Sequence, residues 1–251
     1  MQRPSVGWRT RVVMVIATLM GDAADGLDTS RLRAVRQAPF DPRIHNLGNT
    51  GVGGFVHAKC AKFATDLIDA RAYGGRNVRK ELAQLMRQRK VPRVAVEVGC
   101  GVGTLTQELV YVDYFSDILA VDTSRQMVNE ARRRVQNVTF EVANGCDLSN
   151  SSSGLAVASF VMHELPTEAH EDLLQTMLLA TEGATDGQVW IADIELTYTP
   201  SRAMLAGEPY IAEYLANFNE TIRRVAGGNG CHVSSLVLVA NHVRVWVVER
   251  P

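Results

Sequence analysis

The feature that most constrains this chain is a glycine-rich turn that follows a short β-branched segment. Residues 94–98 read Val-Ala-Val-Glu-Val, and Gly99, Gly101 and Gly103 come directly after them. A compact apolar run predicts a buried strand. Glycines after such a strand allow a sharp turn and let a ligand approach the backbone closely. The segment therefore predicts a strand–turn–helix unit with a binding site at its turn.

Two carboxylates flank this turn. Glu97 lies within the predicted strand, and Asp122 follows Gly99 by 23 residues, at the end of the next predicted strand. An acid at that second position can accept hydrogen bonds from a ribose diol, and Glu97 can face a cationic amino group. Glu97 would repel a pyrophosphate, and Thr104 stands where a dinucleotide-binding turn has its third glycine. The expected ligand is a nucleoside with a zwitterionic tail.

Strand-like and helix-like segments alternate after residue 93, which is typical of an α/β fold with a mostly parallel sheet covered on both faces. The predicted strands are residues 94–98, 118–121, 138–143, 155–162, 189–194, 236–239 and 243–248. The last two are separated by a tight turn at 240–242 and predict an antiparallel hairpin at the end of the chain.

Helices are predicted between these strands, and helical spacing extends the pattern toward the amino terminus. A capping box at Thr123 and Gln126 predicts the start of the helix after the second strand. Another late helix is expected at 209–225. Upstream, a loop is expected at 41–54, then a helix, then a second helix at 78–89. The helix after the loop carries four apolar residues at helical spacing: Val56, Cys60, Phe63 and Leu67.

Three regions are expected along the chain. Residues 1–40 form an amino-terminal extension, either a targeting segment or poorly ordered. Residues 41–92 form a helical lid or extension, and 93–251 form the main domain. The apolar run at 12–20 follows basic residues and resembles a signal peptide, while the alternative is an element that packs onto the domain. No apolar run reaches the ~20 residues of a membrane-spanning helix.

Charge and cysteine content bound the function. The net charge is −1, from 26 Lys and Arg against 27 Asp and Glu, whereas proteins that bind nucleic acid carry a basic excess. The four cysteines form neither a CxxC pair nor a Cys/His cluster at metal-ligand spacing. We therefore expect no nucleic-acid partner and no metal site.

Four parts of the sequence resemble the class I S-adenosylmethionine-dependent methyltransferases of the type-11 group. Residues 96–104 resemble the first motif of the family, with Glu97 in place of the commoner Asp. Asp122 matches its ribose-binding acid, residues 140–148 its adenine-binding loop and residues 158–166 its fourth-strand motif. The resemblance implies a Rossmann-like, mostly parallel seven-stranded sheet with a C-terminal antiparallel hairpin, preceded by an amino-terminal helical extension.

The resemblance also implies S-adenosyl-L-methionine as the cofactor. The residues expected to bind it are Glu97, Gly99, Cys100, Gly101, Gly103, Asp122, Thr123, Met127, Asn144, Gly145, Cys146, Ser159 and Phe160. Asn144 departs from the family pattern because it replaces an acid, although its side-chain carbonyl can still accept from an exocyclic amine. The acidic pair before the fourth strand and the Pro-Gly-Gly turn before the fifth are also replaced, by residues 149–154 and 181–187.

Methyl transfer from a sulfonium needs the donor and acceptor held in line, and a base only where the acceptor must lose a proton. No catalytic residue is assigned, and the candidates are His163, Glu164 and Tyr210. His163 is alternatively a loop anchor. Two acids at the end of the fifth strand, Asp193 and Glu195, are expected either to bind a cationic acceptor or to be exposed. Tyr210, Tyr214 and Asn217 belong to a late helix that could roof the acceptor pocket.

The function expected from these features is methyl transfer to a small-molecule acceptor by in-line displacement, in an intracellular protein, cytoplasmic or organellar. Two alternatives stay open: a non-catalytic protein of the same fold that binds S-adenosylmethionine, and an NAD-dependent oxidoreductase.

Overall fold

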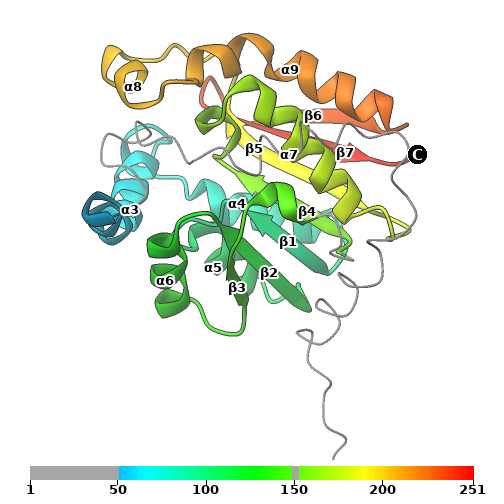
Figure 1. The fold of residues 1–251 in the computed structure, drawn as a ribbon, viewed down its shortest axis with the longest axis horizontal. Helices are drawn as coiled ribbons and strands as arrows, with labels where there is room; N and C mark the ends of the chain where they lie inside the picture. The colour runs from blue at the N-terminus through cyan, green and yellow to red at the C-terminus, as the bar shows by residue number, and fades with distance from the viewer. Residues whose placement is uncertain (1–50, 149–152) are drawn as a thin grey trace, which may run out of the picture.

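A computed structural model describes residues 51–148 and 153–251 (Figure 1). The predictions for residues 1–40, for the loop up to residue 50 and for most of the serine-rich segment lie outside these ranges. Residues 51–54, expected in the loop, instead begin helix α3 (Gly51–Arg71). Among the described residues, no helix is both long and apolar enough to cross a membrane.

A seven-stranded sheet organises the described residues, as expected. Its strands are β1 (Val94–Val98), β2 (Asp117–Asp122), β3 (Thr139–Val142), β4 (Leu155–Ser159), β5 (Gln188–Ile194), β6 (His232–Val239) and β7 (Val243–Glu249). They lie in the order β3-β2-β1-β4-β5-β7-β6. Strands β1 to β5 pair in parallel, and β7 runs antiparallel to both β5 and β6. The mostly parallel sheet with a C-terminal hairpin is thus confirmed.

Helices cover both faces of the sheet (Figure 1). One face packs against α7 (Thr167–Ala180) and α9 (Ile211–Gly228). The other packs against α4 (Val78–Gln88) and α5 (Thr104–Tyr111). The central strands are therefore buried on both sides and consist mostly of apolar residues, as is typical of parallel strands.

Strand β4 ends earlier than the sequence predicts. The apolar run to residue 162 suggested a strand over its whole length, but β4 stops at Ser159. Phe160 follows with a φ of 57°, in the left-handed region. A short 3-10 helix, η2 (Met162–Glu164), comes next. This turn directs the residues after β4 across the carboxyl edge of the sheet, where open α/β sheets bind ligands.

The helix after β2 is capped one residue later than predicted. Helix α6 spans Arg125–Arg134, and its N-cap is Ser124, whose hydroxyl accepts a hydrogen bond from the Met127 backbone N–H at 3.3 Å. The capping box expected at Thr123 is therefore wrong. The shift leaves the Thr123 side chain exposed at the sheet edge.

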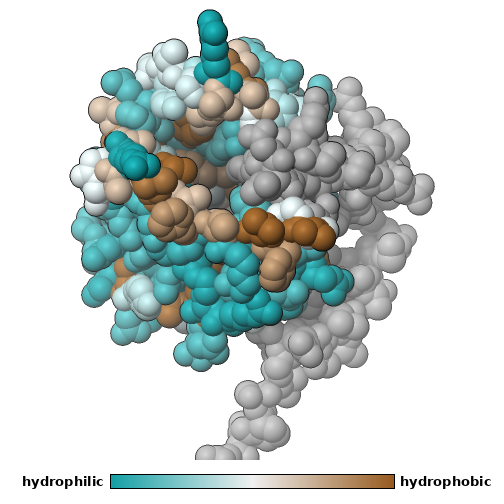
Figure 2. Space-filling model, turned by 90° about the vertical axis from the view of Figure 1, so that its left-hand side faces the viewer, coloured by the Kyte–Doolittle hydropathy of each residue, from teal (hydrophilic) through white to brown (hydrophobic). Residues whose placement is uncertain are grey.

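Helix α3 forms where helical spacing predicted it, but its apolar residues face outward. Phe63 is 71% exposed and Val56 43% exposed, whereas the buried contact to the domain is made by the small Ala58. Ala58 packs against Val102 and Met127. Figure 2 views this side of the molecule and shows apolar side chains among polar ones on its surface.

Candidate ligand-binding site

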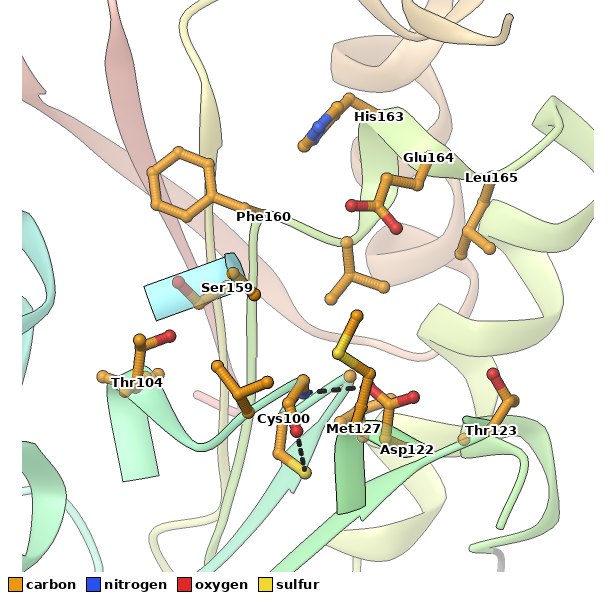
Figure 3. A pocket seen from close by; sticks show the side chains of 18 of the residues that line it. Cys100, Thr104, Asp122, Thr123, Met127, Ser159, Phe160, His163, Glu164 and Leu165 are labelled. Carbon is orange, nitrogen blue, oxygen red and sulfur yellow. Dashed lines mark hydrogen bonds between the residues drawn. The ribbon is translucent and has the colours of Figure 1, made fainter. Parts of the chain in front are cut away.

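A cavity of about 1050 Å³ opens at the carboxyl ends of β1, β2 and β4. Its volume is close to the upper end of the ~300–1,000 Å³ typical of small-molecule sites. Figure 3 shows Asp122, Thr123 and Met127 on one side of the hollow, with His163 and Glu164 on the other. Helix α3 closes part of it through residues such as Ala61 and Ala64.

The glycine turn shapes the floor of this cavity. Gly99 has a φ of +69°, and a Cβ there would lie 2.4 Å from a methyl group of Val161, so only glycine fits. Gly101 has a φ of +51°, and a Cβ there would meet nothing within 4 Å. Because Gly101 lines the cavity, its missing side chain leaves a cradle open to a ligand.

Asp122 at the end of β2 holds this turn in place. Its Oδ2 accepts a hydrogen bond from the Gly101 backbone N–H at 2.8 Å, and its Oδ1 accepts one from the Ser124 backbone N–H at 2.8 Å. Burial raises the pKa of Asp122 to about 6, against the opposing effect of these two bonds. Each carboxylate oxygen has a second lone pair, so the group can still accept from a diol.

Glu97 lies deeper in the same cavity, with only 2% of the residue exposed. Its Oε2 accepts a hydrogen bond from the Thr106 hydroxyl of α5 at 2.6 Å. Burial raises the pKa of Glu97 to about 8, and the Thr106 bond only partly offsets this. The carboxyl is therefore largely protonated at pH 7 without a ligand, and a cation beside it would draw it into the ionised form.

The other predicted cofactor residues gather at the cavity with one exception. Those that line it are Cys100, Thr123, Met127, Asn144, Gly145, Cys146, Ser159 and Phe160. The side-chain carbonyl of Asn144 accepts from the Cys146 backbone N–H at 3.0 Å, which fixes the loop after β3. Gly103 is not among the lining residues. A Cβ there would lie 3.2 Å from that of Ala131, so Gly103 serves the close approach of α5 to α6.

His163 lies at the opposite end of the cavity, bound to a buried acid. Its Nδ1 is 2.7 Å from Oδ1 of Asp193, which also accepts the Met162 backbone N–H through Oδ2 at 2.8 Å. Burial by itself lowers the pKa of His163, but the charge and hydrogen bond of Asp193, with the charges of Glu164 and Glu208, raise it to about 9. The ring is therefore an imidazolium at neutral pH.

The two acids at the end of β5 are neither exposed nor free for a cationic acceptor. Asp193 is 0% exposed and holds His163, while Glu195 is 2% exposed. Glu195 accepts from Nε of Arg244 at 2.9 Å, across the β5–β7 pair. The expectation that these acids are exposed is wrong because both are buried. Neither carboxylate is available to a cationic acceptor, because each already pairs with a neighbouring cation.

The late helix contributes less to the cavity than expected. Tyr210, just before α9, lines it together with His163 and Glu164. Tyr214 is fully buried, donates its hydroxyl to the Ile194 carbonyl at 2.7 Å and lies outside the cavity lining. Asn217 is exposed on the outer side of the helix. The prediction that Tyr214 and Asn217 roof the pocket is therefore wrong.

Sequence reasoning missed Arg79, a cation of α4 that lines the cavity. Its guanidinium bonds Asp69 of α3 at 3.2 Å and lies over the ring of Phe160, with 4.5 Å from Cζ to the ring centroid. Arginine supplies most of the basic residues of this chain. The local sequence therefore did not distinguish Arg79 from the arginines that are exposed on the surface. Within the described ranges, no group of three or more His, Cys, Asp or Glu residues could hold a metal ion.

The comparisons with known proteins agree with this geometry. Residues 95–182 match a family model described as a methyltransferase domain. A trans-aconitate 2-methyltransferase of Methylobacterium nodulans is 34% identical over 139 residues, which cover 54% of this chain and 52% of the relative. One of Methylobacterium radiotolerans is 29% identical over 126 residues, covering 49% of this chain and 48% of the relative. The chain thus spans about half the length of the curated relatives it matches.

Solved structures share the fold at low identity. A TehB-like methyltransferase from Corynebacterium glutamicum superposes with a TM-score of 0.54 at 19% identity, covering 78% of this chain and 99% of its own. The plantazolicin methyltransferase BamL superposes with a TM-score of 0.58 at 12% identity, covering 90% and 100%. These structures therefore show a shared Rossmann-like fold. Within it, residues 95–182 of this chain match a family model described as a methyltransferase domain.

Proposed function

We propose that this protein transfers a methyl group from S-adenosylmethionine to a small-molecule acceptor. The observation that carries the proposal is a single cavity lined by the acids Asp122 and Glu97 and by Gly101, whose missing side chain leaves open space. An adenosyl ligand fits this arrangement because Asp122 can accept from its ribose and Glu97 can face its ammonium group. The loop capped by Asn144 would then border the adenine.

The acceptor would occupy the remaining end of the cavity, beside His163, Glu164 and Tyr210. No described residue hydrogen-bonds Nε2 of His163. This N–H can therefore donate a hydrogen bond to the molecule that receives the methyl group and orient it. A ring with a pKa of about 9 does not act as a base at neutral pH. The proposed catalysis therefore consists of holding the acceptor atom in line with the methyl carbon. A cavity of about 1050 Å³ and a net charge of −1 both favour a small molecule.

The test of this proposal has two parts. S-adenosylmethionine is expected to raise the melting temperature, because a ligand that binds only the folded state stabilises it. Purified protein incubated with a metabolite extract and methyl-labelled S-adenosylmethionine is expected to label a low-molecular-weight product. A thermal shift with NAD and none with S-adenosylmethionine would instead support an oxidoreductase. Binding without any labelled product would support a non-catalytic binding protein.

A side chain in the glycine cradle should weaken cofactor binding, in addition to the backbone strain that any side chain has at this positive φ. We expect Gly101→Val to lower the affinity for S-adenosylmethionine at least ~10-fold in calorimetry, because the side chain enters the ligand space. Gly74→Val is the matched control: Gly74 also has a positive φ (+64°) and open space around its Cβ, yet lies outside the cavity lining. Equal affinities in the two variants would contradict the proposed cofactor position.

A further inference from the structure

We propose that Arg79 binds the carboxylate of the methionine tail of S-adenosylmethionine, while Glu97 faces the ammonium group of the same tail. This role rests on the proposed cofactor, and through it Arg79 of α4 would contribute to cofactor binding. Together Arg79 and Glu97 would make the cavity complementary to a zwitterion and not only to a nucleoside.

Arg79 has hydrogen-bond donors to spare inside the cavity. Its side chain is only 14% exposed, and Asp69 accepts one of its N–H groups through Oδ1. A guanidinium carries five N–H donors. Among the described residues, only Asp69 accepts a hydrogen bond from the Arg79 guanidinium. A buried cation with unused donors is costly unless a second acceptor completes its shell. A ligand carboxylate would complete it, in the two-pronged geometry for which arginine is suited.

The guanidinium is fixed in place by an aromatic platform. It lies over the ring of Phe160, and Tyr73 stacks near the same ring, with centroids 6.4 Å apart and planes inclined by 17°. Phe160 reaches this position because its left-handed backbone (φ 57°) turns the chain at the end of β4. A non-glycine residue is uncommon in that region, and here the turn places the Phe160 ring against the Arg79 guanidinium.

Arg79 and Glu97 lie at the same end of the cavity. Strand β4, which ends just before Phe160, pairs in parallel with β1, and Val157 is the partner of Glu97. The charge of Arg79 lowers the pKa of Glu97 against the larger effect of burial, so the two groups interact electrostatically. A ligand with adjacent ammonium and carboxylate groups matches this pair, because each group meets the opposite charge. Asp69 belongs to α3, so the same contact ties the covering helix to the cofactor.

The experiment compares two ligands that differ only in the carboxylate: S-adenosylmethionine and its decarboxylated form. Wild-type protein should bind S-adenosylmethionine more tightly, and Arg79→Met should remove that preference by weakening only the carboxylate-bearing ligand. The expected loss is about tenfold to hundredfold, the range for a charge-assisted hydrogen bond lost from a buried site. Arg79→Lys, which keeps the charge but not the fork, should retain part of the preference.

Two controls keep the result interpretable. Lys80→Met removes a neighbouring, exposed cation of α4 and should leave both affinities unchanged. The pair Arg79→Met with Asp69→Asn removes both charges of the ion pair, and it replaces the single variant if that variant does not fold. Equal weakening of both ligands, or a wild-type protein that binds both equally, would overturn the role of Arg79. A wild-type protein that binds neither ligand would instead refute the proposed cofactor.

Discussion

Asp122→Ala is expected to lower the affinity for S-adenosylmethionine by roughly 100-fold, because a charged acceptor bonded to both ribose hydroxyls is worth more than a neutral one. The substitution also leaves the backbone N–H groups of Gly101 and Ser124 without their acceptor. The glycine turn should therefore loosen, and the melting temperature without ligand should fall. Titration calorimetry measures the first effect and thermal denaturation the second.

Two further variants separate ribose binding from loosening of the turn. Asp122→Asn keeps one oxygen acceptor and should give an intermediate affinity. Asp117→Ala, at the amino end of the same strand and outside the cavity lining, should change nothing. An Asp122→Ala protein that binds within threefold of wild type would show that the ribose lies elsewhere.

The sequence predicted which residues meet at the glycine turn because the signals for that turn are local. A strand that runs into Gly99 and Gly101 has few ways to turn, and Asp122 ends a strand that must pair beside it. Parallel pairing then brings these residues to one edge without any knowledge of distant contacts. The same reasoning predicted the strands of the sheet, since each contains a short apolar or β-branched segment, although β4 ends at Ser159 and β6 begins at His232, both earlier than expected.

The opposite side of the cavity could not be predicted in this way. Arg79 reaches the site only because α4 packs against the sheet, and one arginine among many gives no pattern. Asp193 and Glu195 were expected to be exposed or to bind a cationic acceptor. The cation that pairs with Glu195 is Arg244, which is distant in the sequence, so no local motif indicates the pair. Helix α3 was predicted from apolar spacing, yet the face that meets the domain is the one with Ala58. Tertiary contacts, not local patterns, decide these positions.

Binding of S-adenosylmethionine at neutral pH is expected to release a proton from Glu97. Burial raises the pKa of this carboxyl to about 8 in the folded protein, above the 4.5 of the free group. Without ligand the folded state therefore holds this proton between about pH 4.5 and 8, whereas the unfolded state loses it. An ammonium group beside the carboxyl favours the ionised form, so binding must remove the proton. The affinity should accordingly rise with pH by up to about tenfold per unit below pH 8.

The measurement is calorimetry between pH 6.5 and 7.5, above the pKa of Asp122, in two buffers of different ionisation enthalpy. Wild-type protein should release close to one proton and bind more tightly at the higher pH. Glu97→Gln, whose amide oxygen can still accept from Thr106, should show neither effect. 5′-Methylthioadenosine lacks the ammonium group and should bind wild-type protein with no pH dependence in this range. Proton release that persists in Glu97→Gln would place the ammonium group beside another titratable group. Glu97 of β1 would then not bind the methionine tail.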